Sequence, residues 1–309
     1  MHPPRPASSR LSSPPASSDS SPHSSPGRAE WKVDLHAHST CSDGALSPRA
    51  LVELAFSVGV EVLALTDHDT VAGVANATIA ATELGMELVA GVEVSAFARK
   101  EVHILGLFVD VSCTALLAQL HVLSTGRVDR LREIGRRLAA VGASIDVDAV
   151  LEAAGGANVG RPHLASALIA AGHVKTFQEA FDRFLGRDAP AYLPAGRYEA
   201  TDAIALIHAA GGVAVLAHPG VNDMDDQIRG LVDAGLDGLE VMHPAHDGDA
   251  RDRYLGFCKL YGLLISGGAD FHSPSGPNLP GAFGISRKGL EALRERRSVL
   301  RWAGASKGS

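Results

Sequence analysis

Cysteine is scarce in this sequence, and its placement disfavours two kinds of site. The 309 residues contain three cysteines, Cys41, Cys113 and Cys258, and no two of them form a C-x-x-C pair. A disulfide framework and a thiolate zinc site are therefore not expected. So few cysteines are typical of a reducing compartment, and we expect a cytoplasmic protein.

Long hydrophobic runs and an excess of positive charge are also missing. No uncharged apolar run approaches the roughly 20 residues that cross a bilayer, so the sequence predicts no membrane span. The formal net charge is −7, with 28 Lys and Arg against 35 Asp and Glu. Duplex DNA is held by clustered cations that displace counterions, so it is not an expected partner. A local cationic pocket remains compatible with this charge.

Large apolar side chains are almost absent from the first 28 residues, which contain ten Ser and seven Pro. Such a segment cannot bury enough surface to offset the entropy of ordering it. It has neither the apolar centre of a secretory signal nor the pattern of an amphipathic targeting helix. We therefore expect a disordered tail over residues 1–30, and a short flexible C-terminus over residues 303–309.

From Trp31 onward, short apolar runs alternate with helical patterns, which is typical of a parallel α/β sheet buried on both faces. Seven runs have the usual strand length: 33–38, 62–67, 87–93, 102–109, 213–218, 238–243 and 263–270. Between the first two, Ser47 is placed to cap a helix with Pro48 at its first position. We expect the α/β unit to comprise residues 31–110 and 201–302.

About ninety residues separate the fourth and fifth runs, and their patterns are helical. We expect an inserted helical subdomain over residues 111–200, in which Thr176 begins a capping box. A helix over residues 127–141 carries five arginines: Arg127, Arg130, Arg132, Arg136 and Arg137. They could face a phosphate, but Asp129 and Glu133 neutralise part of their charge, so a solvated face is the favoured interpretation.

Histidines and carboxylates recur at the ends of the apolar runs. In the first run, the two-residue period of a strand puts Asp34, His36 and His38 on one side. Two imidazoles placed in this way can hold one metal ion, and Asp34 can accept the N–H of a ligand ring and so fix its tautomer. The last run repeats the arrangement with Asp270 and His272.

Single residues of the same types accompany the other runs: Asp43, His68, Glu93, His103 and His218. In a parallel barrel the C-terminal ends of all strands share one face, so these residues can meet in one pocket. A lone histidine is more often a core residue. However, burying an ionisable group at the end of nearly every run costs folding free energy, unless the groups serve a function such as binding metal. At Thr66–Asp69 the pattern offers either His68 or Asp67 with Asp69. His243 and His246 are weaker candidates, with structural or supporting roles favoured.

Five short motifs in order resemble the PHP family, the polymerase and histidinol phosphatase superfamily. They are DLHAHS at 34–39 followed by SDG at 42–44, TDHD at 66–69, GVE at 91–93, AHP at 217–219 and GADFH at 268–272. The resemblance implies a distorted (β/α)7 TIM-like barrel, the PHP fold, with the helical insertion as a substrate cap. It also implies a trinuclear metal site and selects His68 at the ambiguous position. The nine implied ligands are His36, His38, Asp43, His68, Glu93, His103, His218, Asp270 and His272.

Within the family, the insert sequence is similar to the branch of nucleoside 3′,5′-bisphosphate phosphatases, some of which are 5′→3′ exoribonucleases. We therefore expect hydrolysis of a phosphate monoester of small nucleotides, with 3′-phosphate removal favoured and short RNA as a further substrate. Attack by a metal-activated hydroxide needs no catalytic residue beyond the ligands. Three divalent ions are expected, Mn²⁺ first, although the mixed N/O ligands also suit Fe²⁺ or Zn²⁺.

A second substrate phosphate requires a cationic clamp, for which we single out Arg161, His163 and Arg187. Asp34 and Asp69 are expected to support the ligands. Three alternatives stay open: a histidinol-phosphate phosphatase, a barrel amidohydrolase, and a metal-binding module without turnover. The amidohydrolase is less favoured, because no run ends in the lysine that such a site would be expected to use.

Overall fold

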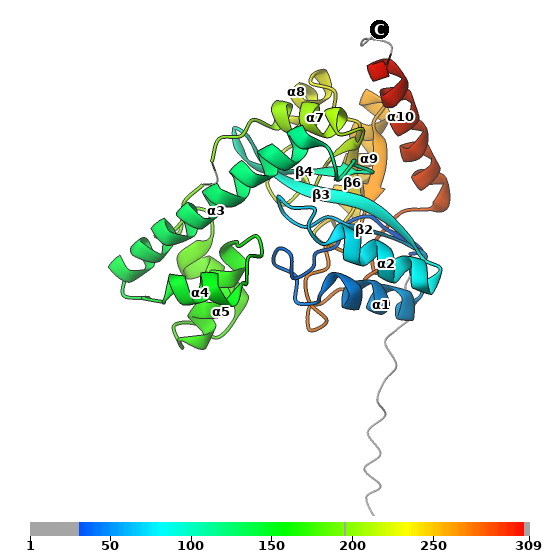
Figure 1. The fold of residues 1–309 in the computed structure, drawn as a ribbon. Coiled ribbons are helices and arrows are strands. Elements are labelled where there is room, and N and C mark those ends of the chain that lie inside the picture. Colours follow the sequence, from blue (N-terminus) through cyan, green and yellow to red (C-terminus); the bar gives the residue numbers. More distant parts are fainter. Residues whose placement is uncertain (1–30, 195, 306–309) are drawn as a thin grey trace, which may run out of the picture.

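The structure is a computed structural model that describes residues 31–194 and 196–305 (Figure 1). The expected tail over residues 1–30 lies outside the described residues, as do residues 306–309. Helix α10 (Arg287–Ala305) continues through residues 303–305, and the flexibility expected over residues 303–309 stays a prediction. Among the described helices, none combines the length and apolar character needed to cross a bilayer.

Within the described residues, seven strands form one sheet in sequence order from β1 to β7. They are β1 (Val33–Asp34), β2 (Val62–Leu65), β3 (Glu87–Ala98), β4 (Lys100–Leu107), β5 (Val213–Leu216), β6 (Gly238–Met242) and β7 (Leu264–Gly267). A bridge between Ala37 and Phe271 joins the chain after β1 to the chain after β7. The sheet thereby closes into a nearly complete barrel, as the expected PHP fold requires.

The expectation of an all-parallel sheet is wrong at β4, which runs antiparallel to both β3 and β5. Strand β3 continues beyond its predicted end, and Arg99 alone, with a φ of 58°, turns the chain into β4. Parallel strands need a crossover of a dozen or more residues, and so short a connection permits only a hairpin. His103 consequently lies in the middle of β4, opposite Ser95 of β3.

Helices pack around the barrel: α1 (Pro48–Val58), α2 (Val74–Leu84), α7 (Ala200–Ala209), α8 (Ile228–Asp233), α9 (Gly248–Tyr261) and α10. The Ser47 side chain accepts the N–H of Ala50 at the start of α1, which confirms the predicted cap. One buried cluster joins residues of β1, β2, β4 and β5 to Leu290 and Leu293 of α10. The apolar ends of the strands are thus covered, and the polar ends remain for a site.

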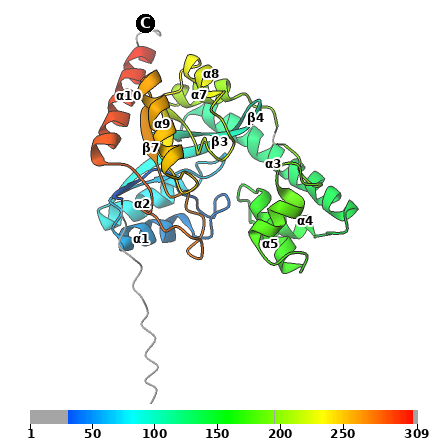
Figure 2. The same ribbon diagram turned by 180° about the vertical axis from the view of Figure 1, so that it is seen from behind.

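The helices between β4 and β5 are α3 (Thr114–Ala140), α4 (Val147–Ala153), α5 (Arg161–Ala170), α6 (Phe177–Ala180) and the π-helical turn η1 (Phe181–Leu185). A separate hydrophobic cluster lies among them, with Leu131, Ile134, Leu164 and Leu168 fully buried. Figures 1 and 2 show that α3 leads away from the barrel to α4 and α5, which lie beside the barrel. These helices therefore have their own core next to the polar strand ends.

Candidate metal centre

All nine side chains that the sequence singled out as ligands come together in one cluster. They form four overlapping groups in which the ligand atoms lie within 4.8 Å of one another. The groups are His38/Asp43/His68/His272, His36/His218/Asp270, His36/His38/Glu93 and His68/Glu93/His103. Six imidazoles and three carboxylates from strands far apart in the sequence thus share one site.

Glu93 on β3 lies at the centre of the cluster. Its Oε2 is 3.2 Å from each of three ring nitrogens, Nε2 of His36, Nε2 of His38 and Nδ1 of His68. Its Oε1 is 2.8 Å from Nδ1 of His103 and 3.0 Å from Nε2 of His218. A single carboxylate with only 1% of its surface exposed therefore faces five imidazoles.

The other two carboxylates lie at opposite sides of His38. Asp270 Oδ1 is 3.1 Å from Nε2 of His38 and 3.3 Å from Nε2 of His36. Asp43 Oδ1 is 3.6 Å from Nδ1 of His38, and its Oδ2 is 3.6 Å from Nε2 of His68. Both nitrogens of the His38 ring consequently face a carboxylate, so this ring links two of the groups.

The charges of the cluster hold its carboxylates ionised. Burial by itself raises the pKa of Glu93, but the surrounding imidazoles together outweigh it and bring that pKa well below its usual range. Burial also raises the pKa of Asp270, but the charges of His36 and His272 together with hydrogen bonds from His243 and His38 bring it well below its usual range. Burial likewise lowers the pKa of His68 well below its usual range, which favours the neutral ring that a metal requires.

Several buried atoms of the cluster fit a bound cation. Nδ1 of His68, Nδ1 of His103 and Oδ1 of Asp270 make no hydrogen bond within the described residues. His103 Nδ1 is only 2.8 Å from Glu93 Oε1, yet the pair lacks hydrogen-bond geometry. Unpaired buried polar atoms are costly, and electron-pair donors that converge without bonding to one another suit a shared metal ion. Mixed imidazole and carboxylate ligands match Mn²⁺, Fe²⁺ or Zn²⁺.

The carboxylate that orients His36 is Glu240 of β6, not Asp34. Glu240 Oε1 lies 2.9 Å from Nδ1 of His36. Asp34 instead accepts backbone N–H groups of His36, Ala269 and Gly281, and burial raises its pKa to about 7. Regular pairing of β1 stops at Asp34, so the assumed alternation does not carry that side chain to the rings. The sequence signal for Glu240 was a lone acid inside an apolar run.

The structure resolves the ambiguity at Thr66–Asp69, as the PHP resemblance implied, because His68 joins the cluster and its neighbours do not. Asp67 accepts hydrogen bonds from the hydroxyls of Ser39 and Ser42, both at 2.7 Å. These bonds hold the loop that carries Asp43. Asp69 accepts the N–H of Ser95 at 2.7 Å and pairs with Arg127. These contacts support the segments that carry the ligands His68 and Glu93.

The weaker candidates have supporting places. His243 Nε2 is 3.3 Å from Oδ2 of Asp270. His246 has Nδ1 at 3.0 Å from the Val241 carbonyl, and its Nε2 accepts the N–H of Gly220. Both roles agree with the favoured interpretation of these two histidines.

The backbone beside the cluster is strained. Asp69, His218 and Asp270 have φ values of 49°, 28° and 48°, a region that costs non-glycine residues about 1–3 kcal/mol each and is concentrated at functional sites. Gly268 approaches so closely that an added Cβ would lie 2.4 Å from the backbone nitrogen of His36. The chain therefore adopts unfavourable backbone conformations at positions that bring the metal ligands together.

The arginines of α3 do not all lie on a solvated face, so that interpretation is wrong for two of them. Arg127 donates to Asp69 and to the Ser95 hydroxyl, both at 2.6 Å. Arg130 makes a two-pronged contact with Glu101 of β4, at 3.2 and 3.3 Å. The helix packs beside the barrel, and this turns both guanidinium groups toward it. Other arginines of this helix, Arg132, Arg136 and Arg137, are half-exposed or exposed and pair with acids of the insert.

The three residues proposed as a clamp have different surroundings. Arg161 lies near Glu101, with NH2 at 3.5 Å from Oε2, and its guanidinium also stands over the Tyr192 ring. His163 is half-buried, lines a groove beside the Asp43 loop and has its pKa lowered by burial. Arg187 is exposed and takes no part in the Glu101 cluster.

The sequence and the fold both match known proteins. A family model described as the PHP domain matches residues 34–183. A 5′-3′ exoribonuclease from Haemophilus influenzae is 40% identical over 251 residues, which are 79% of this chain and 91% of the relative. A 3′,5′-nucleoside bisphosphate phosphatase from Chromobacterium violaceum is 37% identical over 249 residues, covering 78% of this chain and 87% of the relative.

A solved structure supports the same assignment. The crystal structure of a candidate metal-dependent phosphoesterase from Bifidobacterium adolescentis aligns with a TM-score of 0.80 at 33% identity, covering 86% of this chain and 96% of that one. The chain belongs to the PHP family. It is a metal-dependent phosphoesterase, a hydrolase of phosphoric esters.

Proposed function

We propose that the protein removes the 3′-phosphate from nucleoside 3′,5′-bisphosphates to give 5′-nucleotides, with 5′→3′ hydrolysis of short RNA as a second activity of the same site. The names of the two relatives support this substrate class. The observation that carries the proposal is a group of arginines beside the metal centre. Glu101, which holds Arg130 and Arg161, is two residues from His103 on the same strand.

The nine clustered side chains would hold three divalent ions, with Mn²⁺ the first choice and Fe²⁺ or Zn²⁺ also suited to the donors. Such ions polarise a phosphoryl oxygen and lower the pKa of bound water toward about 7. Glu93 would be a central ligand of this set, because it faces five imidazoles. Glu240 keeps the His36 ring turned so that Nε2 points into the cluster.

The second phosphate of the substrate would be held by Arg161 and Arg130. Arg suits this role because its planar fork binds phosphate oxygens in pairs. The contact between Arg161 and Glu101 is long, at 3.5 Å, so an incoming phosphate competes with a weak internal partner. His163 stays in the proposal, because it lies beside the Asp43 loop. Arg187 is exposed, and its part in the clamp stays a prediction.

The test compares three substrates with Mn²⁺-loaded protein: adenosine 3′,5′-bisphosphate, a short 5′-phosphorylated RNA and histidinol phosphate. Phosphate release and the nucleotide product are measured together. The proposal predicts that the bisphosphate is turned over fastest and gives 5′-AMP. Formation of 3′-AMP, or faster turnover of histidinol phosphate, would contradict it.

A further inference from the structure

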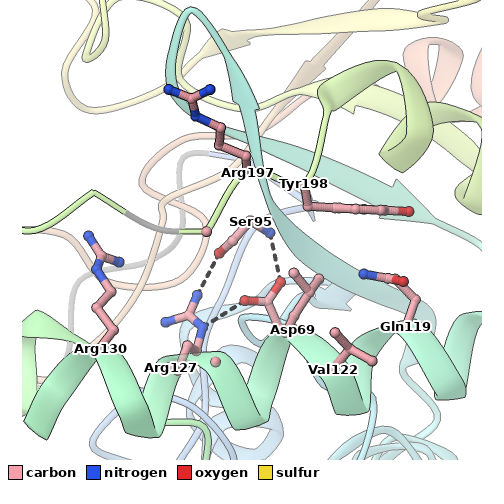
Figure 3. A pocket seen from close by; sticks show the side chains of 11 residues that line it. Asp69, Ser95, Gln119, Val122, Arg127, Arg130, Arg197 and Tyr198 are labelled. Atoms are coloured by element: carbon pink, nitrogen blue, oxygen red, sulfur yellow. Dashed lines mark hydrogen bonds and ion pairs between the residues drawn. The ribbon is translucent and has the colours of Figure 1, made fainter.

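A cavity of about 280 Å³ lies between helix α3, the β3 strand and the segment before α7 (Figure 3). Val122 and Leu123 of α3 give it an apolar floor. The ring of Tyr198 is seen edge-on in Figure 3 and lies opposite Val122 and Gln119. A space lined by an aromatic ring and aliphatic side chains suits a planar ligand.

Polar groups of the cavity fall into two sets. Arg127, Asp69 and Ser95 satisfy one another through short hydrogen bonds, drawn in Figure 3. By contrast, the Gln119 amide and the Tyr198 hydroxyl have no hydrogen-bond partner within the described residues. These free groups are what a ligand with its own donors and acceptors would engage.

Charge at the rim favours an anionic ligand. Arg197 is exposed, and its contact is with the ring of Phe97, so its guanidinium has no acidic partner among the described side chains. Arg130 also lines the cavity. An anion that reaches the rim meets these two arginines, with Glu101 as the acid already paired to Arg130.

The cavity adjoins the metal centre. Asp69 follows the ligand His68, and Ser95 lies two residues beyond Glu93 on the same face of β3. Arg127 bonds to both Asp69 and Ser95 at 2.6 Å. Arg127, Asp69 and Ser95 therefore form a wall between the cavity and the segments that carry the metal ligands.

From this arrangement we propose that the cavity binds the base of the nucleotide substrate. The base stacks on Tyr198, its edge hydrogen-bonds to the Gln119 amide, and Arg197 attracts the negatively charged molecule at the rim. Stacking on an aromatic ring accepts any base, because every base has a π-face. The proposal rests on the nucleotide substrate proposed above and adds the residues that recognise its nucleoside part.

The test compares adenosine 3′,5′-bisphosphate with 1,3-propanediol bisphosphate, which keeps two phosphates on a three-carbon spacing and lacks the base. Tyr198→Leu retains apolar volume and removes the ring, so it lowers the ratio of kcat/KM values for these substrates about tenfold. Arg197→Gln lowers kcat/KM for both substrates. The control Tyr261→Leu, on a tyrosine of α9 that does not line the cavity, keeps the wild-type ratio. An unchanged ratio in folded Tyr198→Leu protein overturns the proposal.

A binding measurement separates failure of this inference from failure of the proposed reaction. Equilibrium dialysis compares 5′-AMP with ribose 5-phosphate on the wild-type protein and on Tyr198→Leu, without any turnover. The inference predicts tighter binding of 5′-AMP to the wild-type protein and loss of that preference in the variant. Equal binding of the two ligands to the wild-type protein, or an unchanged preference in the variant, would overturn it even if bisphosphate is hydrolysed.

Discussion

Glu240 Oε1 lies 2.9 Å from Nδ1 of His36, and both side chains are fully buried. The other oxygen of Glu240 accepts the backbone N–H of His218 at 2.8 Å. One carboxylate of β6 therefore orients ligands that follow β1 and β5. Ligating histidines commonly donate their second ring N–H to a carboxylate, which fixes the tautomer and the ring plane.

Glu240→Gln is expected to weaken metal binding about 10- to 100-fold. The amide nitrogen of Gln cannot accept the His218 N–H, and the neutral side chain holds the His36 ring less strongly. Metal affinity is measured by competition with a chelator. Glu61→Gln, on an exposed acid paired with Arg287, serves as the control. Equal affinity in the Glu240 variant and the control would refute the orienting role.

Asn158 connects the insert to two ligand segments. Its side-chain amide donates to the His68 carbonyl at 2.7 Å, and its backbone N–H bonds to the Cys41 carbonyl at 2.9 Å. Asn158→Ala leaves the buried His68 carbonyl without this donor and is expected to cost about 1–3 kcal/mol of unfolding free energy. Urea denaturation measures the loss, and Asn76→Ala on the exposed face of α2 is the near-neutral control. A loss no larger than that of the control argues against the link.

Arg161→Ala is expected to raise KM for adenosine 3′,5′-bisphosphate about tenfold or more, because charge-assisted hydrogen bonds to the second phosphate are worth about 1.5–3 kcal/mol. Steady-state kinetics on the bisphosphate and on a simple aryl phosphate separate this effect from damage to the metal centre. Arg132→Ala, on an exposed arginine of α3 paired with Asp148, provides the control. If Arg161→Ala affects both substrates equally, Arg161 does not recognise the second phosphate.

Gly268→Ala is expected to destabilise the protein by about 1–3 kcal/mol or more and to disturb His36, because the added methyl group meets backbone that cannot easily move. Gly256→Ala provides the matched control, since it lies within α9 with nothing within 4 Å of the added Cβ. There alanine should be neutral or stabilising by up to about 1 kcal/mol. Thermal unfolding of both variants checks the difference, and similar melting temperatures would contradict the close approach.

Much of the site was predictable because metal ligands are chemically conspicuous in buried runs. His36, His38 and Glu93 could be recognised as costly residues in apolar surroundings, and the structure brings them together with the other six. The motifs of the PHP family then selected His68 over its acidic neighbours. The closed barrel was implied by the family resemblance, whereas the strand spacing by itself predicted only an α/β sheet.

Other features depend on geometry that spacing does not encode. The antiparallel β4 follows from a one-residue turn at Arg99, and β3 runs past its predicted end to Ala98, with Val94 and Ala96 buried. Glu240 was missed because a single acid within an apolar run has no partner in the local sequence. Arg127 was misplaced because the direction of its guanidinium depends on how α3 packs against the barrel.

We propose that these nine side chains form one metal-dependent centre for phosphoester hydrolysis. The most direct measurement titrates Mn²⁺ into metal-free protein and follows bound metal and phosphate release from adenosine 3′,5′-bisphosphate in the same samples. Activity should be absent without metal and should rise with occupancy toward three ions per chain. Full phosphate release from protein shown to contain no metal would contradict it.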